Sequence, residues 1–221
     1  VLDQSAAAYP HHQAAVYFGA GITYATLREL AGRFASALVR LGVRPGDRVA
    51  LHLPNCPQFL IAYYGTLAAG AVIVPFNPLY VEREVGHQLA AVRGQTRVRE
   101  IIVTGIQDYF PPLLRALYPL KARRDGMVVP VPRAPDIHRF ADLLRAGAPS
   151  PAGRVDPAAV AVLLYTGGTT GIPKGAMLTH RNLVSNLLQS RAWYTQLRPG
   201  EDTGLAVLPF FHSYGMTSSM N

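Results

Sequence analysis

Short aliphatic runs alternate with amphipathic segments along most of the 221-residue chain, and this alternation constrains the fold more than any other feature. Runs such as 48–53, 71–74 and 159–165 are rich in aliphatic residues, as buried strands are. The segments 25–41 and 57–69 are predicted helices, and the first keeps its apolar residues at helical spacing. Because strands that alternate with helices form a sheet covered by helices, the pattern predicts an α/β fold.

Turn and cap residues predict where these elements end. Thr23 is the expected N-cap of the helix 25–41, Gly42 is its expected stop, and Asn55 is expected to cap the helix that begins near Pro57. The same reasoning predicts further strands at 14–18, 101–104 and 204–208 and further helices at 81–92, 138–145 and 183–193.

Composition and charge narrow the class of protein. Hydrophobic residues make up 49% of the chain and charged residues 15%. The chain therefore has enough apolar residues to form a large core, and global disorder is excluded. The net charge of +8 favours anionic partners, but the basic residues are scattered and no nucleic-acid-binding motif accompanies them. We therefore expect no nucleic-acid partner, and instead an affinity for anionic small molecules or an anionic membrane surface.

Cysteine usage bears on the compartment. The single cysteine, Cys56, cannot form an intrachain disulfide or a zinc site built on paired cysteines. The sequence as given shows no secretory signal and no apolar run long enough for a transmembrane helix. We therefore predict a cytoplasmic protein.

One loop carries the chemistry. It covers residues 165–175, at the end of a predicted strand, and is rich in glycine and threonine with one lysine. Glycines let several backbone N–H groups face one anion, threonine hydroxyls add donors, and the lysine supplies a full positive charge. This predicts a polyphosphate-binding loop whose ligands are Thr166, Gly167, Gly168, Thr169, Thr170, Gly171 and Lys174. The loop is not a Walker A motif, because Pro173 and Gly175 flank the lysine.

The segment Tyr165–Gly175, with the residues 176–183 that follow, resembles the phosphate-binding signature of the adenylate-forming superfamily. The Gly-Gly pair at 167–168 is most similar to the long-chain fatty-acid–CoA ligase branch. Further pieces resemble other core segments of the superfamily, namely 44–50, Asn55 with Pro57, 70–78 and 208–212.

The resemblance implies a fold and its limits. Residues 1–221 would be the N-terminal part of the AMP-binding domain, with layered sheets flanked by helices. The family's magnesium-binding Glu, ribose-binding Asp and C-terminal domain have no counterpart before Asn221, so we expect an incomplete domain that by itself does not complete the ligation. Between His87 and Ile101 the family usually carries another strand and helix. The sequence leaves open whether this member has a deletion there or the given sequence skips residues.

The resemblance also implies an activity in two steps. A fatty acid is joined to ATP as an acyl-adenylate, with Mg²⁺ assisting, and coenzyme A then takes the acyl group as co-substrate. Lys174 and His212 are the implied catalytic residues. The implied contacts to the β- and γ-phosphates come from Gly168, Thr169, Thr170, Gly171 and Lys174. Thr166 is either a magnesium ligand or an ordinary strand-end hydroxyl, and His212 either orients the carboxylate or is a packed core histidine.

The sequence is also compatible with two other functions. The chain could activate an aromatic or amino-acid carboxylate, or it could be a non-catalytic nucleotide- or lipid-binding fragment. The segment 106–124 joins apolar residues to a basic cluster, which fits either peripheral membrane contact or a core helix with a solvated basic end. Acyl-chain length and oligomeric state are left open.

Overall fold

The structure is a computed structural model that describes residues 1–78, 98–128, 130–149, 153, 155–166 and 174–221. Its helices are α1 (Leu2–Ala8), α2 (Tyr24–Arg40), α3 (Pro57–Ala68), η2 (Ile106–Tyr109), α5 (Pro112–Arg124), α6 (Phe140–Ala146), α7 (His180–Trp193), α8 (Ser213–Gly215) and η3 (Met216–Met220). Its strands are β1 (Gln13–Tyr17), β2 (Ala20–Thr23), β3 (Arg48–Leu51), β4 (Val72–Pro75), β5 (Ile101–Val103), β6 (Ile137–Arg139), β7 (Val160–Thr166) and β8 (Lys174–Thr179). The predicted helix 81–92 lies outside the described residues.

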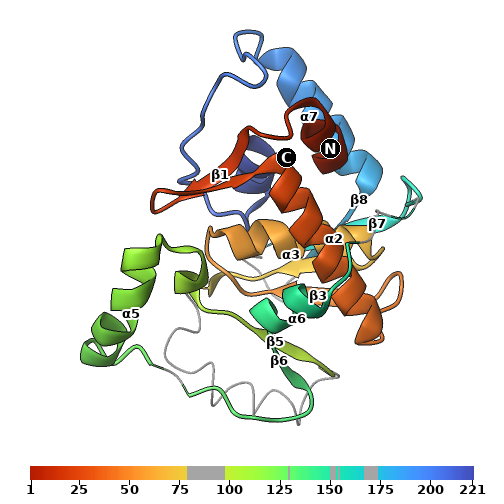
Figure 1. The fold of residues 1–221 in the computed structure, drawn as a ribbon. Helices are drawn as coiled ribbons and strands as arrows, with labels where there is room; N and C mark the ends of the chain where they lie inside the picture. The colour runs from red at the N-terminus through yellow and green to blue at the C-terminus, as the bar shows by residue number, and fades with distance from the viewer. Residues whose placement is uncertain (79–97, 129, 150–152, 154, 167–173) are drawn as a thin grey trace.

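The largest described sheet has the order β3-β4-β7-β8 (Figure 1). β3 and β4 are parallel, β4 and β7 are parallel through the pair Ile73 and Val162, and β8 returns antiparallel to β7. Two smaller pairs accompany it, the antiparallel hairpin β1–β2 and the parallel pair β5–β6. The α/β prediction is confirmed. Because β3, β4 and β7 run the same way, their carboxyl ends share one edge of the sheet, where α/β proteins bind ligands.

The core is centred on α2 and α3, which pack against each other. α2 buries the stripe that its spacing predicted, with Leu27, Phe34 and Leu38 all in the core. α3 is buried around most of its circumference, as expected of a helix enclosed by other elements. Gly65 permits the close approach of the two helices, since a Cβ there would lie 2.8 Å from the backbone oxygen of Ala31.

Two predicted helix ends are confirmed and one is moved. Thr23 caps α2, its hydroxyl accepting the backbone N–H of Thr26 at 3.2 Å, and Gly42 follows the helix with a φ of +84°. α7 begins three residues before the predicted start at 183. There the Thr179 hydroxyl accepts from the Asn182 N–H at 3.2 Å, which forms a capping box that sequence spacing alone did not reveal.

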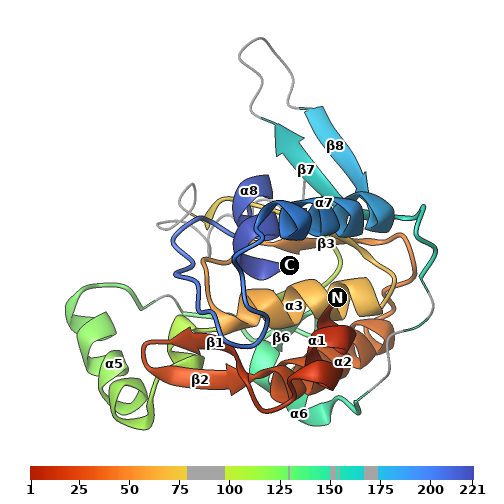
Figure 2. The same cartoon turned by 90° about the horizontal axis from the view of Figure 1, so that it is seen from above.

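The predicted strand 204–208 is wrong. The structure describes these residues as a loop without sheet pairing, and the side chains of Leu205 and Val207 are exposed. Figure 2 shows this stretch as a loop leading from α7 toward α8. Its aliphatic residues are typical of a strand, but it pairs with no described strand. A side chain from elsewhere in the chain binds its backbone instead.

The interpretation of 106–124 as a core helix is wrong for α5, although Tyr109 before it packs against the core. α5 carries Leu113, Leu117 and Leu120 at spacings of four and three, so they share one helix face. Their exposed fractions are 71%, 51% and 66%. The buried residue of α5 is Ala122, on another face. In Figure 1 α5 lies at the margin of the molecule, away from the central sheet. No described helix is long and apolar enough to cross a membrane.

Candidate active site

The two ends of the predicted phosphate loop are brought together by strand pairing. β7 ends at Thr166 and β8 begins at Lys174, and these two residues are register partners across the antiparallel pair. Figure 2 shows the β7–β8 hairpin projecting from the rest of the protein. The residues between them, including the predicted ligands Gly167, Gly168, Thr169, Thr170 and Gly171, lie outside the described part of the chain. The predicted phosphate-binding segment therefore starts from the carboxyl end of β7 and rejoins the sheet at the start of β8.

Lys174 lies at an exposed position at the start of β8. A lysine ammonium on a flexible stem suits a phosphate ligand, because it can follow a mobile polyanion as a point charge. Among the described residues, no group of three or more His, Cys, Asp or Glu side chains gathers to form a metal site. The assignment of Thr166 to magnesium stays a prediction.

His212 is exposed, so the interpretation of it as a packed core histidine is wrong. It is the N-cap of α8, and its Nδ1 accepts the backbone N–H of Tyr214 at 3.4 Å. A neutral imidazole that accepts at Nδ1 carries its proton at Nε2. His212 therefore presents an N–H donor to solvent, which is what orienting an anionic oxygen requires.

The segment before His212 is held by the side chain of Asn55. The Asn55 Nδ2 donates to the backbone oxygens of Ala206 at 3.0 Å and Leu208 at 2.8 Å, and its Oδ1 accepts the Phe210 N–H at 2.8 Å. The prediction that Asn55 caps α3 is wrong, since the N-cap of α3 is Cys56. Asn55 lies in the loop after β3, so its hydrogen bonds hold the His212 segment beside the carboxyl edge of the sheet.

Apolar anchors and a close backbone contact complete the placement of His212. Phe210 is buried and contacts Phe59 of α3 with ring centroids 5.7 Å apart, and Met216, four residues after His212, is also buried. The His212 N–H donates to the oxygen of Pro209 at 3.1 Å. Gly215 packs so closely that a Cβ there would lie 2.2 Å from the same oxygen. The backbone before and after His212 is thus closely packed, while the imidazole itself is exposed.

Sequence reasoning missed the role of Asn55 in this arrangement. Its partners lie 151 to 155 residues away along the chain, beyond the reach of any local pattern. The one usable signal was that Asn55 and the segment 208–212 both belong to the family resemblance. Neighbouring Cys56 is buried, and burial raises the pKa of its thiol to about 11. It is therefore protonated at neutral pH and is not a candidate nucleophile.

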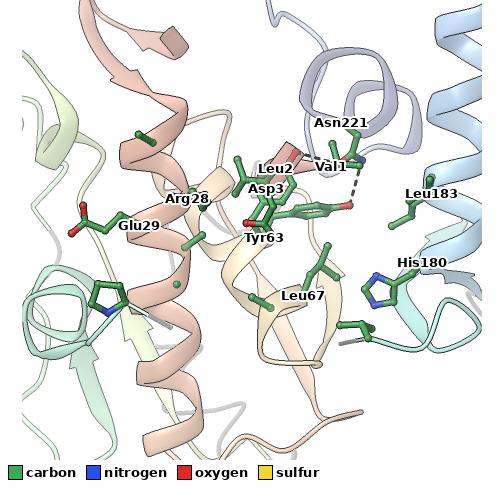
Figure 3. Close-up of a pocket in the computed structure, with 18 of the residues that line it drawn as sticks. Val1, Leu2, Asp3, Arg28, Glu29, Tyr63, Leu67, His180, Leu183 and Asn221 are labelled. Atoms are coloured by element: carbon green, nitrogen blue, oxygen red, sulfur yellow. Dashed lines mark hydrogen bonds between the residues drawn. The ribbon is translucent and has the colours of Figure 1, made fainter. Parts of the chain in front are cut away.

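A separate pocket of about 830 Å³ lies between α2, α3 and α7 (Figure 3). Tyr63, Leu67, His180 and Asn221 are among its lining residues, and none of Thr166, Lys174 or His212 is. The Asn221 Nδ2 donates to the Tyr63 hydroxyl at 3.4 Å. Burial lowers the pKa of His180, which favours its neutral form and fits a structural residue at the start of α7.

Comparison with known proteins decides the family. A family model described as AMP-binding enzyme matches residues 2–221. The chain belongs to the AMP-binding enzyme family. The chain is 37% identical over 242 aligned positions to the long-chain-fatty-acid–CoA ligase of Bacillus subtilis (strain 168). That alignment covers 100% of this chain and 43% of the relative.

Solved structures agree on the fold. The crystal structure of apo MatB from Rhodopseudomonas palustris matches with a TM-score of 0.67 at 27% identity, over 98% of this chain and 42% of that chain. The ATP-bound structure of the same protein matches with a TM-score of 0.62 at 29% identity, over 89% of this chain and 37% of that chain. The present chain thus spans less than half the length of these proteins.

Proposed function

We propose that the protein carrying this chain is a fatty-acid–CoA ligase that acts on long-chain acids. The observation that carries the proposal combines the composition of one segment with its position in the sheet. Thr166 and Lys174 are backbone register partners at the two ends of a Gly- and Thr-rich segment, at the carboxyl end of β7. The chain that holds them is 37% identical to a long-chain-fatty-acid–CoA ligase over its whole length.

In the proposed first step, a carboxylate oxygen of the fatty acid attacks the α-phosphorus of ATP. The bond from that phosphorus to the bridging oxygen breaks, and pyrophosphate leaves with the electron pair. The difficulty is that an anion approaches a polyanion. The ammonium of Lys174 and the backbone N–H groups of the loop lower this repulsion and stabilise charge on the leaving pyrophosphate.

His212 supplies an orienting donor in the same step. Its Nε2–H, available because Nδ1 accepts from Tyr214, can hold a carboxylate or α-phosphate oxygen in line for attack. The carboxylate is already ionised at neutral pH and needs no general base. In the second step the thiol of coenzyme A gives up its proton to solvent and its sulfur attacks the acyl carbonyl. The bond from the acyl carbon to the phosphate oxygen breaks, a thioester forms, and AMP leaves.

Magnesium is part of the expected chemistry, since Mg²⁺ bound to phosphates neutralises charge during phosphoryl and nucleotidyl transfer. Protein sites for Mg²⁺ usually add one or two carboxylates to the substrate phosphates. Among the described residues, no three or more His, Cys, Asp or Glu side chains gather into a metal site. We assign no step to the metal.

The test measures both steps in the protein that carries this chain. With ATP, Mg²⁺ and palmitate, we expect pyrophosphate release and an acyl-adenylate detected by mass spectrometry, and with coenzyme A, palmitoyl-CoA. Parallel reactions replace palmitate with benzoate or with amino acids. Adenylate from benzoate or an amino acid but not from palmitate would assign the protein to another adenylating activity. Nucleotide or lipid binding without any adenylate would overturn the ligase proposal.

The exposed leucine face of α5 favours a second property, contact with an anionic membrane surface from the cytoplasmic side. Leu113, Leu117 and Leu120 form the apolar face, and the last turn adds Lys121, Arg123 and Arg124. Hydrogen bonds from Lys121 and Arg124 lower the pKa of Asp125, which stays ionised beside them. Apolar anchors next to a basic cluster are what an interfacial helix needs.

Reversing two of these charges should weaken vesicle binding. A nearby Lys or Arg contributes about 1 kcal/mol of attraction to an anionic surface, so the double variant Arg123→Glu/Arg124→Glu is expected to bind roughly thirtyfold or more weakly. The measurement is co-sedimentation with phosphatidylcholine vesicles with and without phosphatidylserine, at low and high salt. Arg181→Glu/Arg191→Glu on α7 is the matched control, because both arginines are exposed. Binding that ignores salt, phosphatidylserine and Arg123/Arg124 alike would contradict the proposal.

A further inference from the structure

The segment 206–210 has an unusual means of support. Residues 204–208 form a loop that pairs with no described strand, and Leu205 and Val207 are exposed. Backbone N–H and C=O groups of a loop need hydrogen-bond partners from side chains, other backbone groups or water. Here the carboxamide of Asn55 supplies three such partners, because it binds two carbonyl oxygens and one N–H of the segment.

The chemistry of an amide matches this task, and a carboxylate does not. Asn55 donates through both hydrogens of Nδ2 and accepts through Oδ1, so all three contacts need the donor and acceptor ends together. An aspartate would keep the contact to the Phe210 N–H but would set an oxygen against the carbonyl oxygens of Ala206 and Leu208.

Topology connects this contact to the predicted chemistry. Asn55 lies after the carboxyl end of β3, and Thr166 ends the parallel strand β7 in the same sheet. The Asn55 contacts end at Phe210, two residues before His212. A side chain fixed at one end of the sheet therefore sets the position of the histidine donor relative to the edge from which the phosphate loop departs.

We propose that Asn55 is a positioning residue for adenylate formation, acting through the 206–210 backbone on His212. This proposal rests on the ligase activity proposed above. The protein as a whole need not unfold when the contact is lost, because Phe210 and Met216 still anchor the segment in the core. The expected defect is thus in the geometry of His212, with the phosphate loop still able to bind ATP.

A double-mutant cycle tests this in the protein that carries the chain. Asn55→Ala is expected to lower the kcat of acyl-adenylate formation about ten- to a hundredfold while the KM for ATP changes little. In a His212→Ala background the same substitution should change the rate by less than about twofold, because the group it positions is gone. Equal losses in both backgrounds, or no loss in His212→Ala itself, would overturn the proposal.

The Asn55→Asp variant separates positioning from helix capping. Aspartate caps helices as well as asparagine does, so a capping role predicts that Asp preserves the rate. The positioning role predicts that Asp is at least as defective as Ala. Amide hydrogen exchange gives a readout without substrates, in which Asn55→Ala should speed exchange at Phe210 and leave α2 unchanged. Unchanged exchange at Phe210 would also overturn the proposal, whereas absence of adenylate from the unsubstituted protein would instead overturn the proposed ligase function.

Discussion

Replacing Lys174 by alanine is expected to slow acyl-adenylate formation about ten- to a hundredfold. The substitution removes one charge-assisted contact to the polyphosphate, and such a contact contributes on the order of 1.5–3 kcal/mol. The effect should fall on pyrophosphate departure far more than on binding of the fatty acid, since Lys174 is assigned to the leaving group. The measurement is the rate of pyrophosphate release at saturating palmitate, together with the KM for palmitate.

The chain provides a matched control for this experiment. Its two lysines are Lys121 and Lys174, and Lys121 lies on α5, where it pairs with Asp125. Lys121→Ala should leave the rate within about twofold of the unsubstituted protein. ATP should also protect Lys174, and not Lys121, from acetylation followed by mass spectrometry. A Lys174→Ala rate within about twofold of the unsubstituted rate, or equal acetylation of both lysines with ATP present, would contradict the assigned role.

Replacing Phe59 by alanine is expected to lower the free energy of unfolding by about 3–5 kcal/mol. Phe59 is fully buried on α3, where its ring lies 6.4 Å from that of Tyr63 and 5.7 Å from that of Phe210. Truncation there leaves a cavity between the helix and the loop that carries His212. The measurement is urea unfolding followed by circular dichroism.

Trp193 provides the comparison for this stability change. It is an aromatic residue at the end of α7 with 84% of its surface exposed, so Trp193→Ala should change the free energy of unfolding by less than about 0.5 kcal/mol. A loss below about 1 kcal/mol for Phe59→Ala would mean that the site collapses around the smaller side chain. The central place given to α3 in the core would then be wrong.

Much of the fold follows from local sequence. The apolar stripe of α2, its cap at Thr23 and its stop at Gly42 all depend on residues within a few positions of one another, and the structure confirms each. The strands β3, β4 and β7 were likewise visible as aliphatic runs. Local backbone preferences and side-chain spacing suffice for such elements, because their decisive contacts lie within one or two turns.

The errors share a physical cause. Asparagine often caps helices, and the aliphatic residues of 204–208 are typical of a strand. The predictions of a cap at Asn55 and of a strand at 204–208 both ignored a partner far along the chain. The hydrogen bonds between them replace both the cap and the sheet pairing. Similarly, the leucines of α5 have the spacing of a core helix, yet the structure turns their shared face outward. Periodicity predicts that one face of a helix is apolar but does not predict what covers that face.

The sequence by itself determined the alternation of strands and helices, the glycine- and threonine-rich loop with its lysine, and the family to which these motifs belong. The tertiary structure alone decided that Thr166 and Lys174 pair across two strands, that His212 is exposed with its donor at Nε2, and that Asn55 holds the segment before it. Local preferences act between neighbours in the chain. Contacts across some 150 residues exist only after the sheet and the α2–α3 core have closed around them, and they therefore depend on the whole fold.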